Sequence, residues 1–222
     1  MSIMKHIVPK IMILLSFYGS LSLKAHNEYW HQRVSLFEML PIESSDIIFL
    51  GNSITDGGEF AELFENPNVK NRGINSDTLD GVMERLRQIT AGKPKKIFLL
   101  IGINDISHGV KPDEMIEKYK EIIDYISSNS PETELFVQSV LPINNSFKRY
   151  KNLVCKENDI NKTNSLLKEL TADTNVTYID LWSVFSDGNG NLDSSFTNDG
   201  LHLNGQGYVK WADTIKTLVN DN

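Results

Sequence analysis

A short apolar run at residues 47–50 (IIFL) stops abruptly at Gly51 and is followed by Asn52 and Ser53. An apolar run without alternation is typical of a strand that is buried on both faces, as in parallel sheets covered by helices. Gly51 permits a sharp turn out of such a strand, and a stretch compatible with a helix comes next. Ser53 is therefore expected at the carboxyl end of a strand, which is the edge where open α/β sheets bind ligands.

The pattern of an apolar strand followed by an amphipathic helix recurs along the whole chain. We predict strands at 46–50, 69–73, 96–101, 134–140 and 176–180, and helices at 27–40, 54–65, 78–90, 113–128, 157–172 and 205–219. Residues 143–156 are predicted to be a loop and residues 185–203 mostly a loop, because both stretches are polar. This alternation predicts a parallel sheet of five strands with helices on both faces and right-handed crossovers.

The composition fits one globular domain and argues against several classes of protein. The chain has 222 residues and a formal net charge of −7, with 22 basic and 29 acidic side chains. Lys and Arg do not cluster, so no nucleic acid partner is expected. The single cysteine, Cys155, which we expect to be half-buried, allows neither an intrachain disulfide nor a zinc site made of cysteines.

A metal site and a cofactor are not expected. Acidic and amide residues alternate between Asp187 and Asp193 as in a calcium loop, but the glutamate that closes an EF-hand loop is absent. A turn-rich loop explains the composition of this stretch equally well.

The N-terminus has the pattern of a secretory signal peptide. Lys5 and Lys10 precede an apolar run that continues to Leu23, and the small residue Ala25 follows. The run is short for a membrane span, and an uncleaved anchor is the alternative. We therefore predict a signal peptide at 1–25, one domain at 26–222, and a secreted or periplasmic location without stable membrane insertion after cleavage.

Ser53 has two possible roles at the start of a helix. Serine is a favoured N-cap residue, and it is also a catalytic nucleophile when a base takes its proton and a third group orients that base. His202 is the candidate base, and Asp199, three residues earlier, is the candidate orienting acid. Asp180, at the end of a predicted strand, is the rival acid.

Ester hydrolysis by a serine also needs hydrogen-bond donors for the oxyanion of the tetrahedral intermediate. The candidate donors are the backbone N–H groups of Ser53 and Gly73 and the side-chain amide of Asn104. Glycine at position 73 would let a substrate oxygen approach the backbone. Asn104 follows the third predicted strand and offers a neutral NH₂ donor.

These residues fall into four blocks that resemble the SGNH hydrolases, also called GDSL-type esterases. The blocks read G-N-S-I-T at 51–55, N-R-G-I-N at 71–75, G-I-N-D at 102–105 and D-G-L-H at 199–202, in the order of the family. The resemblance implies a flavodoxin-like α/β/α sandwich with five parallel strands, and an acyl-enzyme mechanism. It is greatest to the sialate O-acetylesterase-like and platelet-activating-factor acetylhydrolase-like branches.

The chain departs from the family pattern at two positions. Asn52 stands where the family name has Asp, which changes the surroundings of Ser53 and not the nucleophile itself. Leu203 stands where the family usually has Pro, which removes no catalytic atom.

The resemblance implies a serine esterase that removes short acyl groups, most simply acetyl, from carbohydrates such as O-acetylated sialic acids or polysaccharides. A lysophospholipase or thioesterase of the same fold is the alternative, and it would need an apolar trench that Phe60, Phe64 and Phe147 could line. The other alternative is a catalytically silent carbohydrate-binding relative. We further expect Asp56 to cap a helix and Asp105 to hydrogen-bond its loop.

Overall fold

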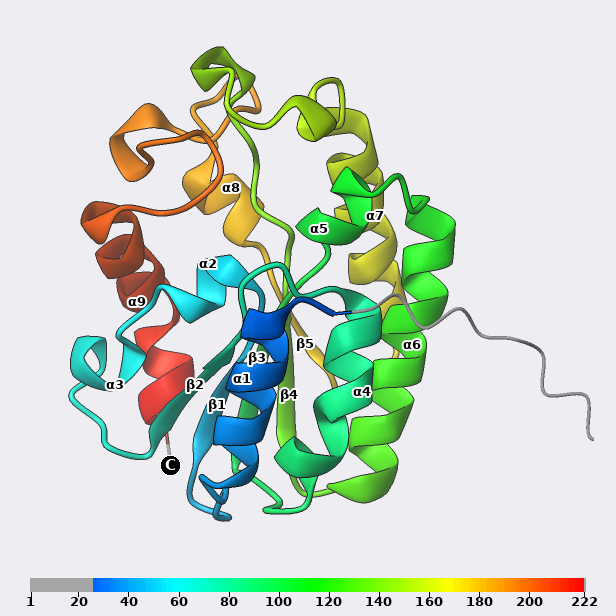
Figure 1. Cartoon of the computed structure of the whole chain (residues 1–222), viewed down its shortest axis with the longest axis vertical. Coiled ribbons are helices and arrows are strands. Elements are labelled where there is room, and N and C mark those ends of the chain that lie inside the picture. Colours follow the sequence, from blue (N-terminus) through cyan, green and yellow to red (C-terminus); the bar gives the residue numbers. More distant parts are fainter. Residues whose placement is uncertain (1–25, 222) are drawn as a thin grey trace, which may run out of the picture.

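The computed structural model describes residues 26–221, so the predicted signal peptide lies outside the described residues. At the centre is a sheet of parallel strands in the order β2-β1-β3-β4-β5 (Figure 1). The strands are β1 (Ile47–Gly51), β2 (Val69–Gly73), β3 (Lys96–Leu100), β4 (Glu134–Gln138) and β5 (Thr177–Ile179). The predicted fold class is confirmed, and the predicted strands are correct apart from small shifts at their ends.

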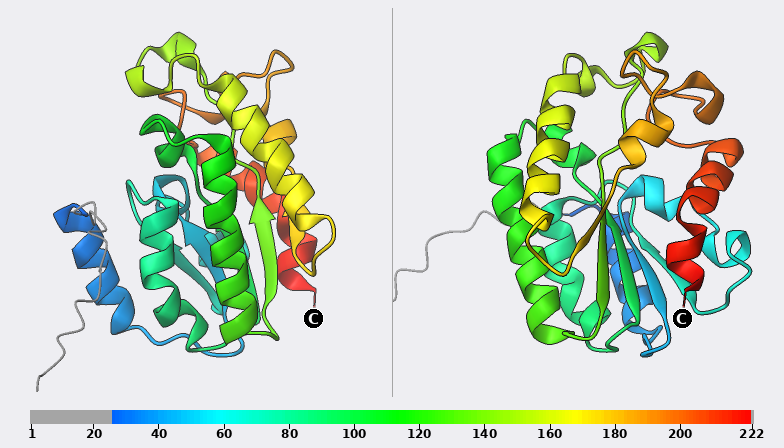
Figure 2. Two further views of the ribbon diagram at one scale, coloured as in Figure 1. Left: turned by 90° about the vertical axis from the view of Figure 1, so that its right-hand side faces the viewer. Right: turned by 180° about the vertical axis from the view of Figure 1, so that it is seen from behind.

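Helices cover both faces of the sheet and give a three-layer α/β/α sandwich. The longer helices are α1 (Glu28–Glu38), α4 (Leu79–Thr90), α6 (Pro112–Asn129), α7 (Glu157–Thr171) and α9 (Gly205–Asn220). Helices α4, α6 and α7 lie on one face, and α9 lies on the other with the short α3 (Phe60–Leu63) (Figure 1). Helix α1 stands outside α4, at the flank of the molecule (Figure 2). No helix between residues 26 and 221 is both long and apolar enough to cross a membrane.

Stacked aromatic rings fill the core beside the central strands. Phe49, Phe98 and Phe136 are neighbours in register on β1, β3 and β4, and their rings stack with centroid separations of 5.1 and 4.5 Å. Trp211 of α9 and Phe60 pack on the same face of the sheet as Phe49. The unbroken apolar runs of the sequence are thus explained by strands buried on both faces.

The helix predicted at 54–65 is wrong in its extent. Two separate short helices occupy this stretch, α2 (Ser53–Asp56) and α3. Gly57 and Gly58 lie between them, and a pair of glycines is a poor continuation of a helix because of its backbone entropy. The break leaves α2 as a single turn at the carboxyl end of β1.

The two predicted loops contain short helical turns and lie together above the carboxyl edge of the sheet. The first contains η1 (Asn145–Phe147) and η2 (Lys151–Leu153), and the second contains η3 (Ser194–Phe196) after α8 (Leu181–Phe185). Cys155 in the first loop is exposed and has a φ of 61°, so the prediction that it is half-buried is wrong. The reason is that Cys155 lies in the turn that follows η2, and the flanking sequence does not indicate this turn.

Candidate active site

Ser53 is the first residue of α2, directly after β1 and the turn at Asn52. The side chain of Asn52 accepts a hydrogen bond from the Ile54 N–H at 3.0 Å, so Asn52 is the N-cap of this helix. Gly51 is required before it, because a Cβ there would lie 2.2 Å from the Leu100 carbonyl oxygen. Since Asn52 caps the helix, the Ser53 hydroxyl is left to contact another partner.

That partner is His202, which lies in the loop before α9. The Ser53 Oγ is 2.9 Å from the His202 Nε2, and the His202 Nδ1 is 2.8 Å from the Asp199 Oδ2. The three side chains therefore form one continuous hydrogen-bonded chain, although 149 positions separate Ser53 from His202. With Asp199 ionised, its carboxylate keeps the proton of the imidazole on Nδ1 and leaves Nε2 to accept the serine proton.

The Asp199 carboxylate is held in place by its own loop. Its Oδ1 accepts the backbone N–H groups of Leu201 and His202 at 2.9 and 2.8 Å. Partial burial raises the pKa of this carboxyl, but hydrogen bonds from His202, Tyr150 and the backbone outweigh it and hold the pKa well below its usual range. Asp199 therefore remains ionised at every pH at which an esterase would be assayed.

The rival acid, Asp180, is engaged elsewhere. It is the N-cap of α8, and its carboxylate accepts the Ser183 N–H at 3.0 Å and the Ser183 hydroxyl at 2.6 Å. Only Asp199 of these two acids is hydrogen-bonded to the His202 ring.

Tyr150, which the sequence analysis did not select, also contacts this chain of side chains. Its hydroxyl donates to the Asp199 Oδ2 at 2.7 Å and lies 3.1 Å from the His202 Nδ1. Burial and the neighbouring Asp199 raise the pKa of Tyr150 to about 12, so its hydroxyl stays protonated and acts as a donor. No sequence motif surrounds Tyr150. Its contact with Asp199 arises from the packing of its loop against residues 199–202, which the sequence does not indicate.

Asn104 lies at the start of α5 (Ile103–Ser107), directly after β3. Its side-chain nitrogen donates to the Asp77 carbonyl oxygen at 2.8 Å. An amide nitrogen carries two protons, so the second remains available to a ligand. The backbone N–H of Ser53 also lacks an acceptor within its helix, as every first-turn N–H does.

Gly73 does not fit the donor role predicted for it. Its N–H donates to the Asn71 Oδ1 at 2.7 Å, while the Asn71 amide nitrogen donates to the carbonyl oxygens of Thr55 and Gly58, both at 2.7 Å. A Cβ at position 73 would lie 2.1 Å from the Asp56 backbone nitrogen. Glycine is thus needed because β2 passes close to α2, and its N–H is already bonded.

The turn that follows β2 lies between the ends of β1 and β3. The turn begins at Ile74, whose N–H donates to the Gly51 carbonyl oxygen at 3.0 Å. It ends at Asp77, whose carbonyl oxygen accepts the side-chain amide of Asn104. The Asp77 N–H bonds back to the Ile74 carbonyl oxygen, and Ser76 has a φ of 65°. A positive φ at the third position is characteristic of a type II turn, where glycine is usual.

Two neighbouring acids have structural partners. Asp105 is buried and accepts the Leu79 N–H at 3.2 Å, so its role is structural as predicted, but its partner is the start of α4 and not its own loop. Burial raises the pKa of Asp105 to about 7, against the opposing effect of the Leu79 N–H. The helix-cap role predicted for Asp56 is wrong, because Asp56 ends α2 and instead accepts the Tyr29 hydroxyl at 2.7 Å and pairs with Arg33 at 3.6 Å.

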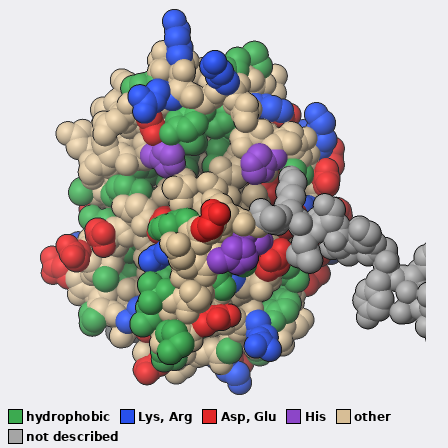
Figure 3. All heavy atoms as spheres, viewed as in Figure 1, with side chains coloured by type: hydrophobic (Ala, Val, Ile, Leu, Met, Phe, Trp, Pro, Cys, Tyr) green, Lys and Arg blue, Asp and Glu red, His purple; other side chains and the backbone are tan. Residues whose placement is uncertain are grey.

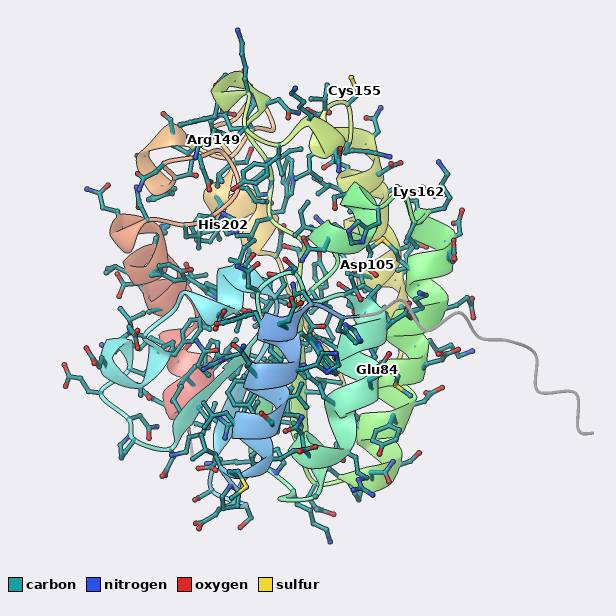
Figure 4. The ribbon with its side chains drawn as sticks, viewed as in Figure 1. Glu84, Asp105, Arg149, Cys155, Lys162 and His202 are labelled. Atoms are coloured by element: carbon teal, nitrogen blue, oxygen red, sulfur yellow. The ribbon has the colours of Figure 1, made fainter. Side chains whose placement is uncertain are left out.

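The arrangement is open and contains no evident place for a metal. The His202 side chain keeps 36% of its exposure, and that of Asp199 keeps 20%. Within residues 26–221 no group of three or more His, Cys, Asp and Glu side chains converges as a set of metal ligands. Figure 4 places His202 on the loop at the carboxyl edge of the sheet, below Arg149.

Comparison with known proteins identifies the family. Residues 49–210 match the GDSL-like Lipase/Acylhydrolase family, and this range holds all three residues of the hydrogen-bonded chain. The protein is a member of this family. The match confirms the family resemblance that the four sequence blocks indicated. Members of this family are generally esterases or other hydrolases.

Two curated relatives match over part of their length. An N-acylneuraminate cytidylyltransferase of Escherichia coli is 29% identical over 182 residues, which is 79% of this chain and 40% of the relative. An enzyme of the same name from Streptococcus agalactiae is 24% identical over 152 residues, or 64% of this chain and 34% of the relative. The acylhydrolase chain thus spans at most two fifths of the length of these relatives.

Solved structures share the fold over almost their whole length. A Streptococcus pneumonia protein named for platelet activating factor has a TM-score of 0.78 and 29% identity, covering 86% of this chain and 92% of that one. A GDSL-like lipase of Bacteroides thetaiotaomicron has a TM-score of 0.72, 18% identity and coverages of 86% and 96%. An acetylxylan esterase of Geobacillus stearothermophilus has a TM-score of 0.63, 18% identity and coverages of 82% and 97%. The last two likenesses establish the fold alone.

Proposed function

We propose that this acylhydrolase is a serine esterase that removes acetyl groups from carbohydrates through Ser53, His202 and Asp199. The observation that carries the proposal is the hydrogen-bonded chain from the Ser53 Oγ to the His202 Nε2 at 2.9 Å and from the His202 Nδ1 to the Asp199 Oδ2 at 2.8 Å. This order of groups is what a serine nucleophile needs. The reaction consumes one ester and one water and requires no cofactor.

In the first half-reaction the His202 Nε2 takes the Ser53 proton while the Oγ attacks the ester carbonyl carbon. The C–O bond to the alcohol then breaks, and His202 gives the proton to the departing oxygen. In the second half, His202 takes a proton from water, the hydroxide attacks the acetyl-serine, and the acid leaves as the proton returns to Ser53. Asp199 stabilises the imidazolium formed in both halves.

The oxyanion donors we propose are the Ser53 N–H, the second amide proton of Asn104 and the Ser76 N–H. Ser76 replaces Gly73 in this role, because the Gly73 N–H is bonded to Asn71. The turn that carries Ser76 is tied to Gly51 at one end and to Asn104 at the other, so it borders both other donors. Replacing Asn104 with Ala is expected to lower kcat by about 10²–10³.

A short acyl group is favoured because two of the aromatic residues considered for a lipid trench lie in the core. Phe60 and Phe64 are 1% and 5% exposed, and both stack on Phe49. A carbohydrate is favoured because the site is open and because two curated relatives are named for N-acylneuraminate, an acidic sugar. We therefore extend the proposal to O-acetylated sugars, sialic acids among them.

The test is hydrolysis of p-nitrophenyl acetate, butyrate and octanoate by the protein and by Ser53→Ala. We expect acetate to be the best substrate and Ser53→Ala to be inactive on all three. Ser35→Ala is the matched control, because Ser35 lies on α1 and its hydroxyl donates to the Gln32 carbonyl oxygen of the same helix at 2.9 Å. A Ser53→Ala variant as active as Ser35→Ala would refute the nucleophile, and a preference for octanoate would refute the short-acyl proposal.

We also propose that residues 1–25 are a signal peptide and that the enzyme acts outside the cytoplasm. The support is the run of Lys5, Lys10, the apolar segment and Ala25. N-terminal sequencing of the protein recovered from the medium or periplasm should begin near His26. Protein that retains Met1 or the apolar segment would contradict cleavage at this site.

A further inference from the structure

The loop between β4 and α7 carries a local excess of positive charge. Residues 145–156, which we call the basic loop, contain Lys148, Arg149, Lys151 and Lys156 and no acidic residue. The chain as a whole has a net charge of −7, so the charge of the basic loop is opposite in sign to that of the whole chain. Lys and Arg side chains gather at this end of the molecule (Figure 3).

The basic loop is fastened directly to the segment that holds His202. Asn144, just before it, donates from its N–H to the Gly200 carbonyl oxygen and from its amide to the Leu192 carbonyl oxygen, both at 2.8 Å. Within the loop, the Tyr150 hydroxyl donates to Asp199 at 2.7 Å. Hydrogen bonds on both sides of residue 149 along the chain therefore tie the basic loop to the segment that carries Asp199 and His202.

Three of the four cations of the basic loop have no acidic partner among the described residues. Lys156 pairs with Asp159 at 2.9 Å. For Lys148, Arg149 and Lys151, which are all exposed, no ion pair occurs within residues 26–221. The positive charge of Arg149 acts on the neighbouring Tyr150, where it opposes the burial that raises the pKa of that hydroxyl. Figure 4 shows Arg149 above His202, at the same end of the molecule.

We infer that Arg149 binds a carboxylate on the substrate, and that Lys148 and Lys151 attract that anion to the site. This inference rests on the proposed esterase function and narrows its substrates to acetyl esters of acidic sugars. A guanidinium group matches a carboxylate with two parallel hydrogen bonds. Unpaired cations at the rim of an open site also raise the local concentration of anionic substrates.

The test compares an O-acetylated N-acetylneuraminic acid with its carboxyl methyl ester, which keeps the acetyl group and loses the charge. We expect the protein to have a higher kcat/KM for the acid, through a lower KM, and this preference to fall as salt is added. In Arg149→Gln the ratio of the two kcat/KM values should fall about tenfold to a hundredfold, the range for losing a hydrogen bond to a charged group.

Lys156→Gln is the matched control, because Lys156 belongs to the same loop but is already paired with Asp159. Turnover of p-nitrophenyl acetate by each variant reports whether its triad is assembled. Suppose that the protein cleaves p-nitrophenyl acetate and has the same kcat/KM for the methyl ester and for the acid. This result would overturn the inference about Arg149 and leave the proposed esterase function intact. An unchanged ratio in Arg149→Gln would also overturn it. Failure on every ester would overturn the proposed function, and this inference with it.

Discussion

One oxygen of Asp199 receives two hydrogen bonds in this site. The Oδ2 accepts from the His202 Nδ1 at 2.8 Å and from the Tyr150 hydroxyl at 2.7 Å. The second donor holds the carboxylate in one orientation beside the imidazole. Tyr150 thereby orients Asp199, and turnover by the enzyme should report this contact.

Replacing Tyr150 with Phe should lower kcat/KM for p-nitrophenyl acetate by about twofold to tenfold. The reason is that the Asp199 carboxylate loses one of the hydrogen bonds that orient it beside His202, which is worth about 0.5–1.5 kcal/mol.

The measurement is kcat/KM for p-nitrophenyl acetate, with the free energy of unfolding in urea measured beside it. An unchanged kcat/KM would mean that Tyr150 does not orient Asp199. A loss of kcat/KM that is accompanied by a loss of stability would mean that Tyr150 only supports the loop.

Ser76 occupies a backbone conformation that glycine usually fills. Its φ of 65° lies in the left-handed region, which costs a residue with a side chain about 1–2 kcal/mol. Ser76→Gly removes this cost, but glycine also raises the conformational entropy of the unfolded chain, which lowers the free energy of unfolding by about 0.5–1 kcal/mol. We expect a net gain of about 0.5–1 kcal/mol in the free energy of unfolding, measured with urea.

Asn75→Gly is the control for this variant, because Asn75 shares the turn and does not have a positive φ. It should lose stability, since glycine there brings the entropic cost and also removes the acceptor of the exposed Ser76 hydroxyl bond at 2.9 Å. Equal effects of the two substitutions would contradict the strain assigned to Ser76.

At the scale of elements, α1 joins two parts of the site that are distant in sequence. Tyr29 donates to Asp56 at the end of the nucleophile helix, and the Trp30 Nε1 donates to Asp77 at 3.0 Å in the turn after β2. Arg85 of α4 pairs with the same Asp77 at 2.8 Å, and both of these side chains are fully buried. The N-terminal helix lies before the family match at residues 49–210, yet it contacts both α2 and this turn.

Trp30→Phe should destabilise the protein by about 1–3 kcal/mol, because it removes a donor from a buried carboxylate. Tyr29→Phe removes an exposed hydrogen bond of similar length and should cost less than about 0.5 kcal/mol. Urea unfolding of the two variants measures the difference. Comparable losses in the two variants would mean that the buried bond to Asp77 contributes no more to stability than the exposed bond to Asp56.

At the scale of the whole molecule, the acids that adjoin the site have opposite effects on the pH dependence of stability. Burial lifts the pKa of Asp105 to about 7 from the ordinary value of 3.8, so the folded protein holds this proton when the unfolded chain has released it. Stability from this group is complete below pH 3.8 and is lost as the pH rises toward 7. Asp199, whose pKa is lowered, contributes in the reverse direction.

Asp105→Asn should remove the contribution that falls with rising pH. Asparagine keeps an oxygen to accept the Leu79 N–H and carries no charge, so the variant should gain relative stability between pH 4 and 7 by up to a few kcal/mol. Urea unfolding at several pH values tests this difference between the two proteins. A difference that is constant with pH would refute the raised pKa of Asp105.

The strands, most of the helices and the four polar blocks could be predicted from the sequence alone. A buried strand needs a continuous apolar run and an amphipathic helix needs its 3.6-residue period, so both leave a local record in the chain. Ser53, Asn104, Asp199 and His202 could be selected because each follows such an element or lies in a short motif. The family match over residues 49–210 agrees with that selection.

Which polar groups contact one another depends on the packing of segments that are distant in sequence. Gly73 looked like a donor in sequence, but the close passage of β2 along α2 and the bond to Asn71 account for it. Tyr150 reaches Asp199 across 49 positions, and Trp30 reaches Asp77 across 47. Such contacts depend on how loops and helices pack around the finished sheet, and packing between distant segments leaves no periodic trace in the residues that make it.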